Sequence, residues 1–265
     1  MSVKTAIIGG TGVYDPSILS GIREEKIATP YGVVKAVLGS YQGREVAFMA
    51  RHGADHSVPP HLVNYRGNIY GLRQLGVKNI LATAAVGSLN PVMKPGQFVF
   101  VDQFLDFTGG RTSTFVEEGV VHLDMTDPYC PGLRGVLAAA AEKEGLEYHH
   151  GGTYVCTQGP RFETVAEIRM FKQLGGDLVG MTSVPEVVLA REAGMCYATI
   201  AMVTNFAAGI SPNKLSHQEV LEIMAENAEK LKGLVMRAIS GMDPGQPCQC
   251  HQENGTDPVR VGSAK

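Results

Sequence analysis

The stretch Gly159–Gly194, GPRFETVAEIRMFKQLGGDLVGMTSVPEVVLAREAG, decides the fold of this chain. Its apolar residues follow a helical period over Thr164–Leu174, form a short apolar run over Asp177–Met181 and return to a helical period over Val184–Ala193. A Gly-Gly pair separates the first predicted helix from the strand. Because a strand between two helices is the repeating unit of α/β proteins, this stretch predicts an α/β fold.

The same alternation of strand and helix extends over most of the chain. We expect a single domain over residues 1–242, in which a mixed, largely parallel β-sheet is flanked by helices and ligands bind at the carboxyl ends of the strands. The other strands are expected at Thr5–Gly9, Val33–Leu38, Glu45–Met49, Asn79–Ala84, Phe98–Asp102, Thr153–Thr157 and Ala198–Thr204, and the other helices at His61–Leu75, Pro131–Glu144 and Ser216–Ser240.

The composition changes after Met242. The segment 243–265, DPGQPCQCHQENGTDPVRVGSAK, has no apolar periodicity, so we expect a disordered or loosely docked tail. Its Cys248, Cys250 and His251 form only a weak zinc signature, because two close thiols and one imidazole have no matching second pair. We therefore expect no metal site, and a redox or stabilising role for the Cys-x-Cys pair stays open.

Composition and charge argue against several classes of protein. The chain has 265 residues, of which 44% are hydrophobic and 18% charged, enough for one substantial core. Its net charge of −3 and the lack of a Lys/Arg run argue against nucleic-acid binding. No apolar run reaches the length of a signal sequence or membrane span, so we expect a cytoplasmic protein. Five cysteines are too few and too scattered for a disulfide framework, and most are expected in the core.

Three predicted strands end in loops that can hold an anion. Thr11 lies in a Gly-Gly-Thr-Gly loop, Arg51 and His52 offer a cation and an imidazole donor, and the small residues around Ala85 allow close approach to the backbone. Each loop alone has a plain structural explanation, but three together favour a phosphate site. The first loop lacks the glycine spacing of a dinucleotide fingerprint or P-loop, which argues against a dinucleotide-dependent oxidoreductase.

Six motifs together resemble the trimeric purine nucleoside phosphorylase and methylthioadenosine phosphorylase family: GGTG, RHG, AAVGSLNP, GPRFETVAE, GMTSVPEVVLAREAG and VTN. The match covers nearly everything before the tail. It implies a nucleoside phosphorylase fold, a homotrimer whose further assembly stays open, and no metal or organic cofactor. It also implies that inorganic phosphate attacks the anomeric carbon of a purine ribonucleoside and releases the base and ribose 1-phosphate. A sensor that binds these ligands without turnover remains an alternative.

Two residues distinguish the branches of this family. Branches that act on 6-aminopurines have serine after GPRF and aspartate at the end of the later strand, whereas this chain has Glu163 and Asn205. The resemblance therefore implies 6-oxopurine nucleosides such as inosine and guanosine. A Glu163 carboxylate would accept from N1–H, and the Asn205 amide would donate to O6 or N7 and stabilise the leaving base. Taken singly, a glutamate in a first helical turn and an asparagine in a turn need no function.

The resemblance also assigns the remaining site residues. His217 would bind the 5′-hydroxyl, but His122 matches the position at which methylthioadenosine phosphorylases lend a histidine across the subunit interface. The 5′ pocket is therefore a hybrid, and S-methyl-5′-thioinosine, or else methylthioadenosine, is the alternative substrate. Phosphate is expected at Thr11, Arg51, His52, the Ala85 backbone and Thr182, the base at Phe162 and the ribose at Met181.

Overall fold

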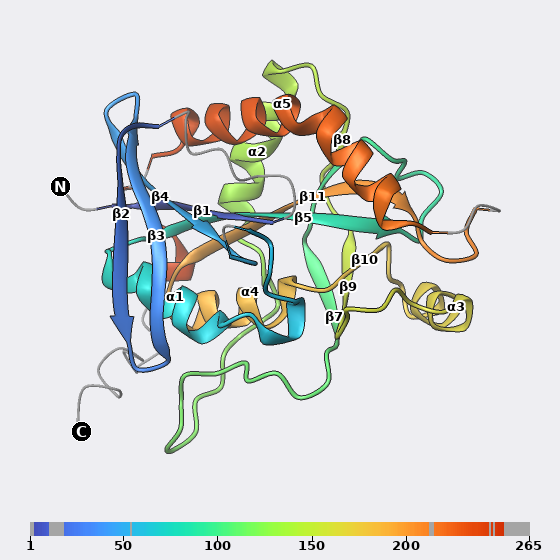
Figure 1. Ribbon diagram of the computed structural model, residues 1–265, viewed down its shortest axis with the longest axis horizontal. Helices are drawn as coiled ribbons and strands as arrows, with labels where there is room; N and C mark the ends of the chain where they lie inside the picture. The colour runs from blue at the N-terminus through green and yellow to red at the C-terminus, as the bar shows by residue number, and fades with distance from the viewer. Residues whose placement is uncertain are drawn as a thin grey trace.

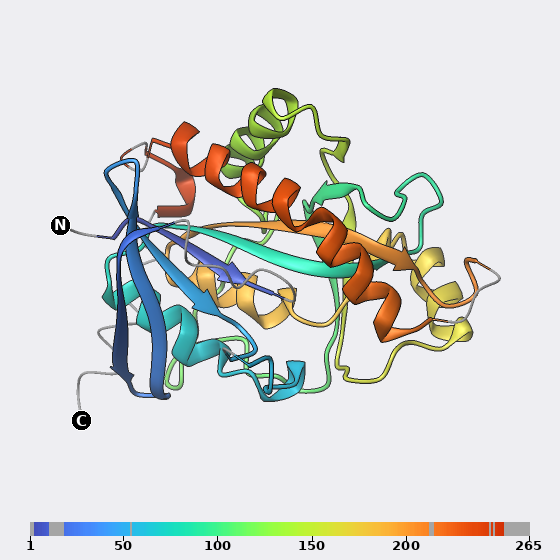
Figure 2. The same ribbon diagram turned by 45° about the horizontal axis from the view of Figure 1, so that its top comes forward.

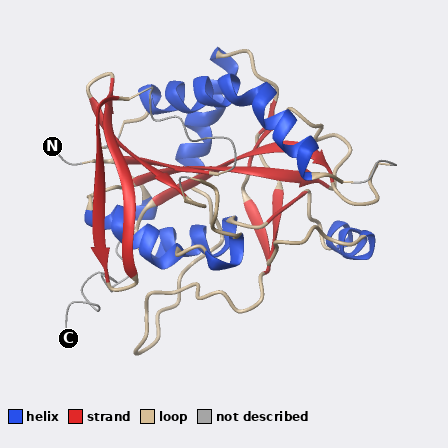
Figure 3. Ribbon diagram, in the orientation of Figure 1, coloured by secondary structure: helices blue, strands red, loops and turns tan. Residues whose placement is uncertain are grey.

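The computed structural model describes residues 3–10, 19–53, 55–211, 215–243, 245 and 247–251. Within them, an 11-stranded mixed sheet, with parallel pairs in the majority, carries helices on both faces (Figures 1 and 3), which confirms the α/β prediction. The strands are β1 Thr5–Gly9, β2 Ser20–Thr29, β3 Gly32–Tyr41, β4 Arg44–Ala50, β5 Asn79–Ser88, β6 Phe98–Phe100, β7 Gln103–Phe107, β8 Tyr148–His149, β9 Thr153–Thr157, β10 Leu178–Gly180 and β11 Cys196–Phe206. The helices are α1 Tyr65–Gln74, α2 Pro131–Lys143, α3 Val165–Gln173, α4 Ser183–Glu192 and α5 His217–Gly241, with 3₁₀ turns η2 Pro60–Leu62 and η3 Gln249–His251.

The centre of the sheet is formed by β1, β5 and β11, which run parallel and are almost entirely buried. The sheet order is β2-β3-β4-β1-β5-β10-β9-β7, and β11 pairs with both β5 and β6. The register of β11 against β5 shifts between Val203 and Asn205, so Thr204 is an extra residue opposite β5. A bulge of this kind re-aims the side chains that follow it, here Asn205.

Two layers of helices enclose the sheet. Helices α2 and α5 pack together on one face, and α5 runs along β11 and β5 (Figure 2), while α1 and α4 pack on the other. Leu137 of α2 and Leu234 of α5 belong to one apolar cluster, and Ile69 of α1 and Val187 of α4 belong to another. The parallel strands therefore end between these layers, where loops from several strands meet.

The prediction missed the strands β2, β7 and β8 and made β6 too long. β2 was not predicted because its residues are charged and mostly exposed, so apolar alternation is absent. The predicted strand Phe98–Asp102 ends at Phe100, because the chain leaves β11 and continues as β7 beside β9. The two-residue β8 is too short for any periodicity.

The predicted helix His61–Leu75 begins only at Tyr65, because the Asn64 side chain accepts the Gly67 N–H at 2.9 Å and caps it there.

Part of the predicted tail packs on the core. Residues Gln249–His251 form η3, and Cys250 is buried in the apolar cluster that contains α2 and α5. The segment 252–265 lies outside the described residues. In the described part of the chain, no helix has the length and hydropathy needed to cross a membrane.

Candidate functional site

A cavity of about 480 Å³ opens where β1, β4, β5 and β11 end. Gly10 follows β1, Arg51 follows β4, Ala85 lies near the end of β5, and Asn205 lies near the end of β11. The cavity volume lies within the range of small-molecule sites. Its position agrees with the expectation that ligands bind at the carboxyl ends of the parallel strands.

Most of the predicted site residues line this cavity: Arg51, His52, Ala85, Phe162, Glu163, Met181, Thr182, Asn205 and His217. Thr11 lies outside the described residues. His122 is exposed and is not among the described residues that line the cavity. Its expected place is the site of a neighbouring subunit, which a single chain does not contain.

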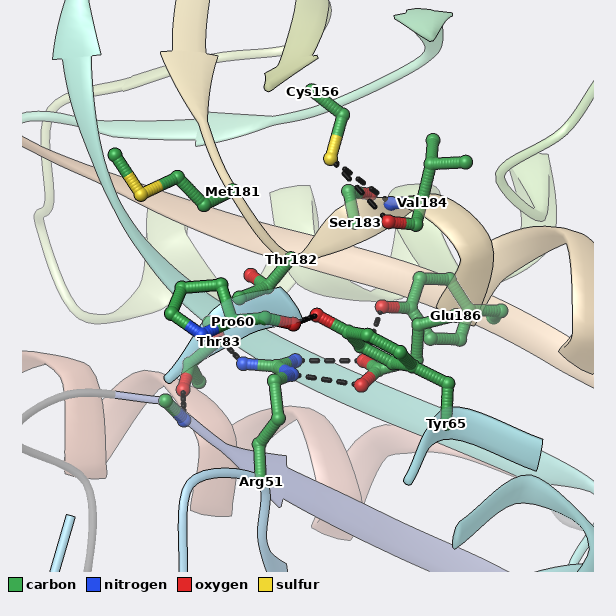
Figure 4. A network of polar contacts seen from close by, with 12 residues as sticks. Arg51, Pro60, Tyr65, Thr83, Cys156, Met181, Thr182, Ser183, Val184 and Glu186 are labelled. Atoms are coloured by element: carbon green, nitrogen blue, oxygen red, sulfur yellow. Dashed lines mark hydrogen bonds and ion pairs between the residues drawn. The ribbon is translucent and has the colours of Figure 1, made fainter. Parts of the chain in front are cut away.

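Arg51 is held by a buried carboxylate that we did not predict. Its Nε and Nη2 atoms donate to the two Glu186 oxygens at 2.7 Å each, and its Nη1 donates to the Thr83 carbonyl at 2.8 Å (Figure 4). Glu186 also accepts from the Tyr197 hydroxyl at 2.7 Å. Burial lowers the pKa of Arg51, but the charge and hydrogen bonds of Glu186 outweigh burial and leave it above its usual value. One N–H on each of Nη1 and Nη2 remains to bind a ligand.

The end of β1 approaches Arg51 so closely that only glycine fits. The Gly10 N–H donates to the Thr83 hydroxyl at 2.9 Å. A Cβ atom on Gly10 would lie 2.6 Å from the Thr83 carbonyl oxygen and 3.0 Å from Arg51 Nη1. This packing explains one glycine of the Gly-Gly-Thr-Gly loop without a ligand.

Thr182 lies on the same wall of the cavity, immediately before α4. It is buried, and its backbone N–H donates to the Tyr154 hydroxyl at 3.4 Å. Within the described part of the chain, its side chain does not cap α4. Thr182 and Arg51 both line the cavity, so a hydroxyl and a guanidinium are available to one ligand.

His52 differs from the expected anion donor. Its Nδ1 donates to the Val58 carbonyl at 2.8 Å, which assigns the free lone pair to Nε2. Burial, and then the charge of Arg51, lower the pKa of His52 to about 4. At neutral pH the ring is therefore uncharged, and its Nε2 accepts rather than donates. The expectation of a donor imidazole is corrected by the hydrogen bond to Val58.

The lowered pKa of His52 predicts a pH dependence of stability. In the unfolded chain, His52 is protonated below a pKa of about 6.5. In the folded protein it is protonated only below about pH 4, so between these values protonation favours the unfolded chain. We expect this residue to contribute a loss of unfolding free energy on the order of 3 kcal/mol as pH falls through that window. Denaturant unfolding of the parent and of His52→Gln, whose side chain has no ionisable group, measures the unfolding free energy across this pH window. The difference between the two pH profiles gives the contribution of His52. Parallel pH profiles would contradict the assignment.

The Asn205 amide has its orientation fixed by two neighbours. Its Oδ1 accepts from the Thr204 hydroxyl at 2.8 Å, and its Nδ2 donates to the Phe206 carbonyl at 3.0 Å. The residue is only 5% exposed, so these bonds are shielded from water. One N–H of the amide is left for a ligand. The amide therefore presents a hydrogen-bond donor to the cavity.

Glu163 presents an acceptor to the same cavity. Its Oε1 accepts from the Thr157 hydroxyl at 2.6 Å, which leaves the other oxygen to a ligand. Burial raises the pKa of Glu163, and the hydrogen bond from Thr157 opposes that increase. Gly159 allows the segment before Glu163 to pack closely against Met181, because its φ is +61° and a Cβ there would lie 2.5 Å from the Met181 sulfur.

Two further residues contribute to the cavity or to its wall and were not predicted. His56 lines the cavity and packs against His52 with ring centroids 4.6 Å apart. Burial, and then the charge of His217, lower the pKa of His56. Both histidines line the cavity. Arg111 donates to the carbonyls of Met181 and Val184 at 2.7 and 2.9 Å and so holds the wall in place. Neither residue lies in a recognisable motif.

The chain is similar in sequence and in structure to known phosphorylases. Residues 4–240 match the model of the phosphorylase superfamily. A probable 6-oxopurine nucleoside phosphorylase of Moorella thermoacetica is 59% identical over 251 residues, which cover 94% of this chain and 96% of the relative. A probable S-methyl-5′-thioinosine phosphorylase of Methanothermobacter thermautotrophicus is 50% identical over 95% of this chain and 89% of the relative. A crystal structure of a methylthioadenosine phosphorylase from an antarctic soil metagenomic library superposes with a TM-score of 0.91 at 39% identity, covering 99% and 96% of the two chains.

Proposed function

Because the chain belongs to the phosphorylase superfamily, we propose that it catalyses the phosphorolysis of 6-oxopurine ribonucleosides in purine salvage. Inosine and guanosine would be cleaved to the free base and ribose 1-phosphate. The observation that carries this proposal is the pairing of an amide donor, Asn205, with a carboxylate acceptor, Glu163, in one cavity. A relative named as a probable 6-oxopurine nucleoside phosphorylase, at 59% identity, supports it.

Base recognition follows from the donors and acceptors of the ring. A 6-oxopurine has an N1–H donor and an O6 acceptor on neighbouring atoms. The free oxygen of Glu163 complements N1–H, and the free N–H of Asn205 complements O6 or N7. A 6-aminopurine reverses both groups and would leave buried polar atoms unpaired, which is an effective basis for discrimination.

Phosphate would bind on the Arg51 wall. The two remaining N–H groups of Arg51, the Thr182 hydroxyl and the Ala85 backbone would supply donors. Thr11, which lies outside the described residues, is expected to add another. Neutral His52 adds an acceptor, which suits the protonated oxygen of hydrogen phosphate. Such a site prefers the monoprotonated anion, and inorganic phosphate is a co-substrate of a reaction that needs no cofactor.

In the reaction, the bond between ribose C1′ and purine N9 breaks and its electron pair passes to the base. A phosphate oxygen forms the new bond to C1′, and the proton of hydrogen phosphate balances the anionic base. The N–H of Asn205 stabilises the charge that develops on N7 or O6. Phosphate counters the positive charge of the ribose, while Met181 and Phe162 position the sugar and the base.

The direct test of phosphorolysis compares inosine with and without phosphate. We expect equal amounts of hypoxanthine and ribose 1-phosphate with phosphate, and negligible hypoxanthine without it. Phosphate-independent release of free ribose would indicate hydrolysis instead. Binding of inosine without any product would indicate a sensor.

The second candidate substrate is S-methyl-5′-thioinosine. The relative of that name and the presence of His122 favour it, whereas His217, which is exposed and lines the cavity, favours a 5′-hydroxyl. If His217 binds this hydroxyl, His217→Ala should lower kcat/KM for inosine about tenfold and leave that for methylthioinosine unchanged or higher, because one hydrogen bond is lost. Equal losses for both nucleosides would contradict this role.

We further propose a cytoplasmic homotrimer in which His122 of one subunit reaches the site of the next. The exposure of His122 on the isolated chain supports this assignment. Sedimentation should give the mass of three chains or of a multiple of three. A monomer with full activity would contradict the shared site.

A further inference from the structure

Four of the five cysteines converge at one point of the structure. Cys130 precedes α2, Cys196 begins β11, and Cys248 and Cys250 come from the tail. Their four Sγ atoms all lie within 4.8 Å of one another, and all four are free thiols. Three are buried and Cys248 is half-buried, so the cluster is enclosed by α2, β11 and the tail.

The separation of the sulfurs fits tetrahedral coordination. Zinc binds cysteine sulfur at ~2.3 Å, which places two sulfurs of a tetrahedron roughly 3.8 Å apart. The Sγ atoms of Cys130 and Cys248 are 3.7 Å apart. Four sulfurs that all lie within 4.8 Å of one another are close enough to share one ion, whereas two disulfides need only two close pairs. Their arrangement therefore matches a closed site with four protein ligands.

Groups around the cluster suit thiolates. The Leu133 N–H points at Cys130 Sγ at 3.5 Å, and His251 Nε2 lies 3.2 Å from Cys196 Sγ. The guanidinium of Arg191 interacts electrostatically with Cys250. Its Nε and Nη1 atoms are buried, and among the described residues neither has a hydrogen-bond partner. A zinc ion with four thiolates carries net negative charge, so a buried cation beside it is compensated.

We propose that Cys130, Cys196, Cys248 and Cys250 bind one zinc ion that fastens the tail to the core. The sequence alone argues against such a site because the second pair of thiols is missing near the tail; folding supplies it from two distant elements. None of the four cysteines is among the described residues that line the substrate cavity, so the ion would be structural. Four protein ligands leave no open position for substrate.

The test measures metal and thiols on the same sample of the full-length protein, purified without chelator. We expect about one zinc per chain by elemental analysis. After unfolding in chelator without reductant, all five thiols should react. The zinc-free protein should take up cobalt and show the intense visible bands of tetrahedral thiolate coordination. It should also melt at a lower temperature than the zinc-loaded protein, because zinc binds the folded chain.

Matched variants locate the site. Cys248→Ser combined with Cys250→Ser should abolish the zinc content, whereas Cys156→Ala, which removes the buried cysteine outside the cluster, should retain it. One reactive thiol per chain without zinc would overturn the proposal and indicate two disulfides. Five reactive thiols without zinc, and no cobalt spectrum, would overturn it in favour of a plain thiol cluster. Zinc retained by the double variant would overturn the assigned ligands.

Discussion

Replacing Asn205 with aspartate is expected to lower kcat/KM for inosine by about 10²–10³-fold, the usual effect of removing one donor from a developing negative charge. The substitution puts a carboxylate oxygen opposite purine O6, acceptor against acceptor. The same oxygen accepts from the 6-amino group of adenosine, so kcat/KM for adenosine should rise by about tenfold, the value of one hydrogen bond. Steady-state kinetics with both nucleosides above neutral pH, where the carboxyl is ionised, measure the change.

Asn227→Asp is a matched control for this experiment. Asn227 is also 5% exposed, and its Nδ2 donates to the Ile223 carbonyl at 2.9 Å, much as Asn205 donates to Phe206. It lies on α5 and is not among the described residues that line the cavity. We expect the ratio of kcat/KM for inosine to that for adenosine in Asn227→Asp to stay at the parent value. Unchanged inosine turnover in Asn205→Asp would remove the argument for base recognition by Asn205.

Replacing Glu186 with glutamine is expected to lower the free energy of unfolding by about 3–5 kcal/mol, because the charge of buried Arg51 loses its partner. For a domain of this size, the melting temperature should fall by roughly 10 °C. The unpaired guanidinium should also attract phosphate more strongly, so phosphate should raise the melting temperature of the variant more than that of the parent. Calorimetry with and without phosphate measures both effects.

Glu167→Gln offers a matched control. Arg161 also donates two hydrogen bonds to Glu167, at 2.7 and 2.9 Å, but that pair lies at the surface. An exposed pair contributes about 1 kcal/mol or less, and glutamine retains the capping box of α3. We expect little change in stability and none in the response to phosphate. Equal losses of stability in the two variants would show that the effect of Glu186→Gln does not come from the burial of the Arg51–Glu186 pair.

The parts of the site that could be predicted from sequence are those that lie in local motifs. Arg51, Glu163 and Asn205 each follow or end a predicted strand or open a helix, and the parallel sheet brings those ends together. The strands β5, β9 and β11 were predicted within a few residues because buried parallel strands read as apolar runs.

The rest depends on contacts between distant parts of the chain. Glu186 lies inside a quoted motif, yet its partner Arg51 is 135 residues away, and helical periodicity cannot reveal that pairing. The hydrogen bond from His52 to Val58 depends on the loop conformation and reverses the expected role of the imidazole. The cysteine cluster likewise joins three segments that no sequence spacing connects.

The most direct test of the central claim is the ratio of kcat/KM for inosine to that for adenosine, measured on the unaltered protein with saturating phosphate. If Glu163 and Asn205 recognise a 6-oxopurine, the ratio should exceed about 10², because adenosine leaves both groups mispaired. Guanosine, which shares O6 and N1–H, should behave like inosine. A ratio near or below one would contradict the account of the site.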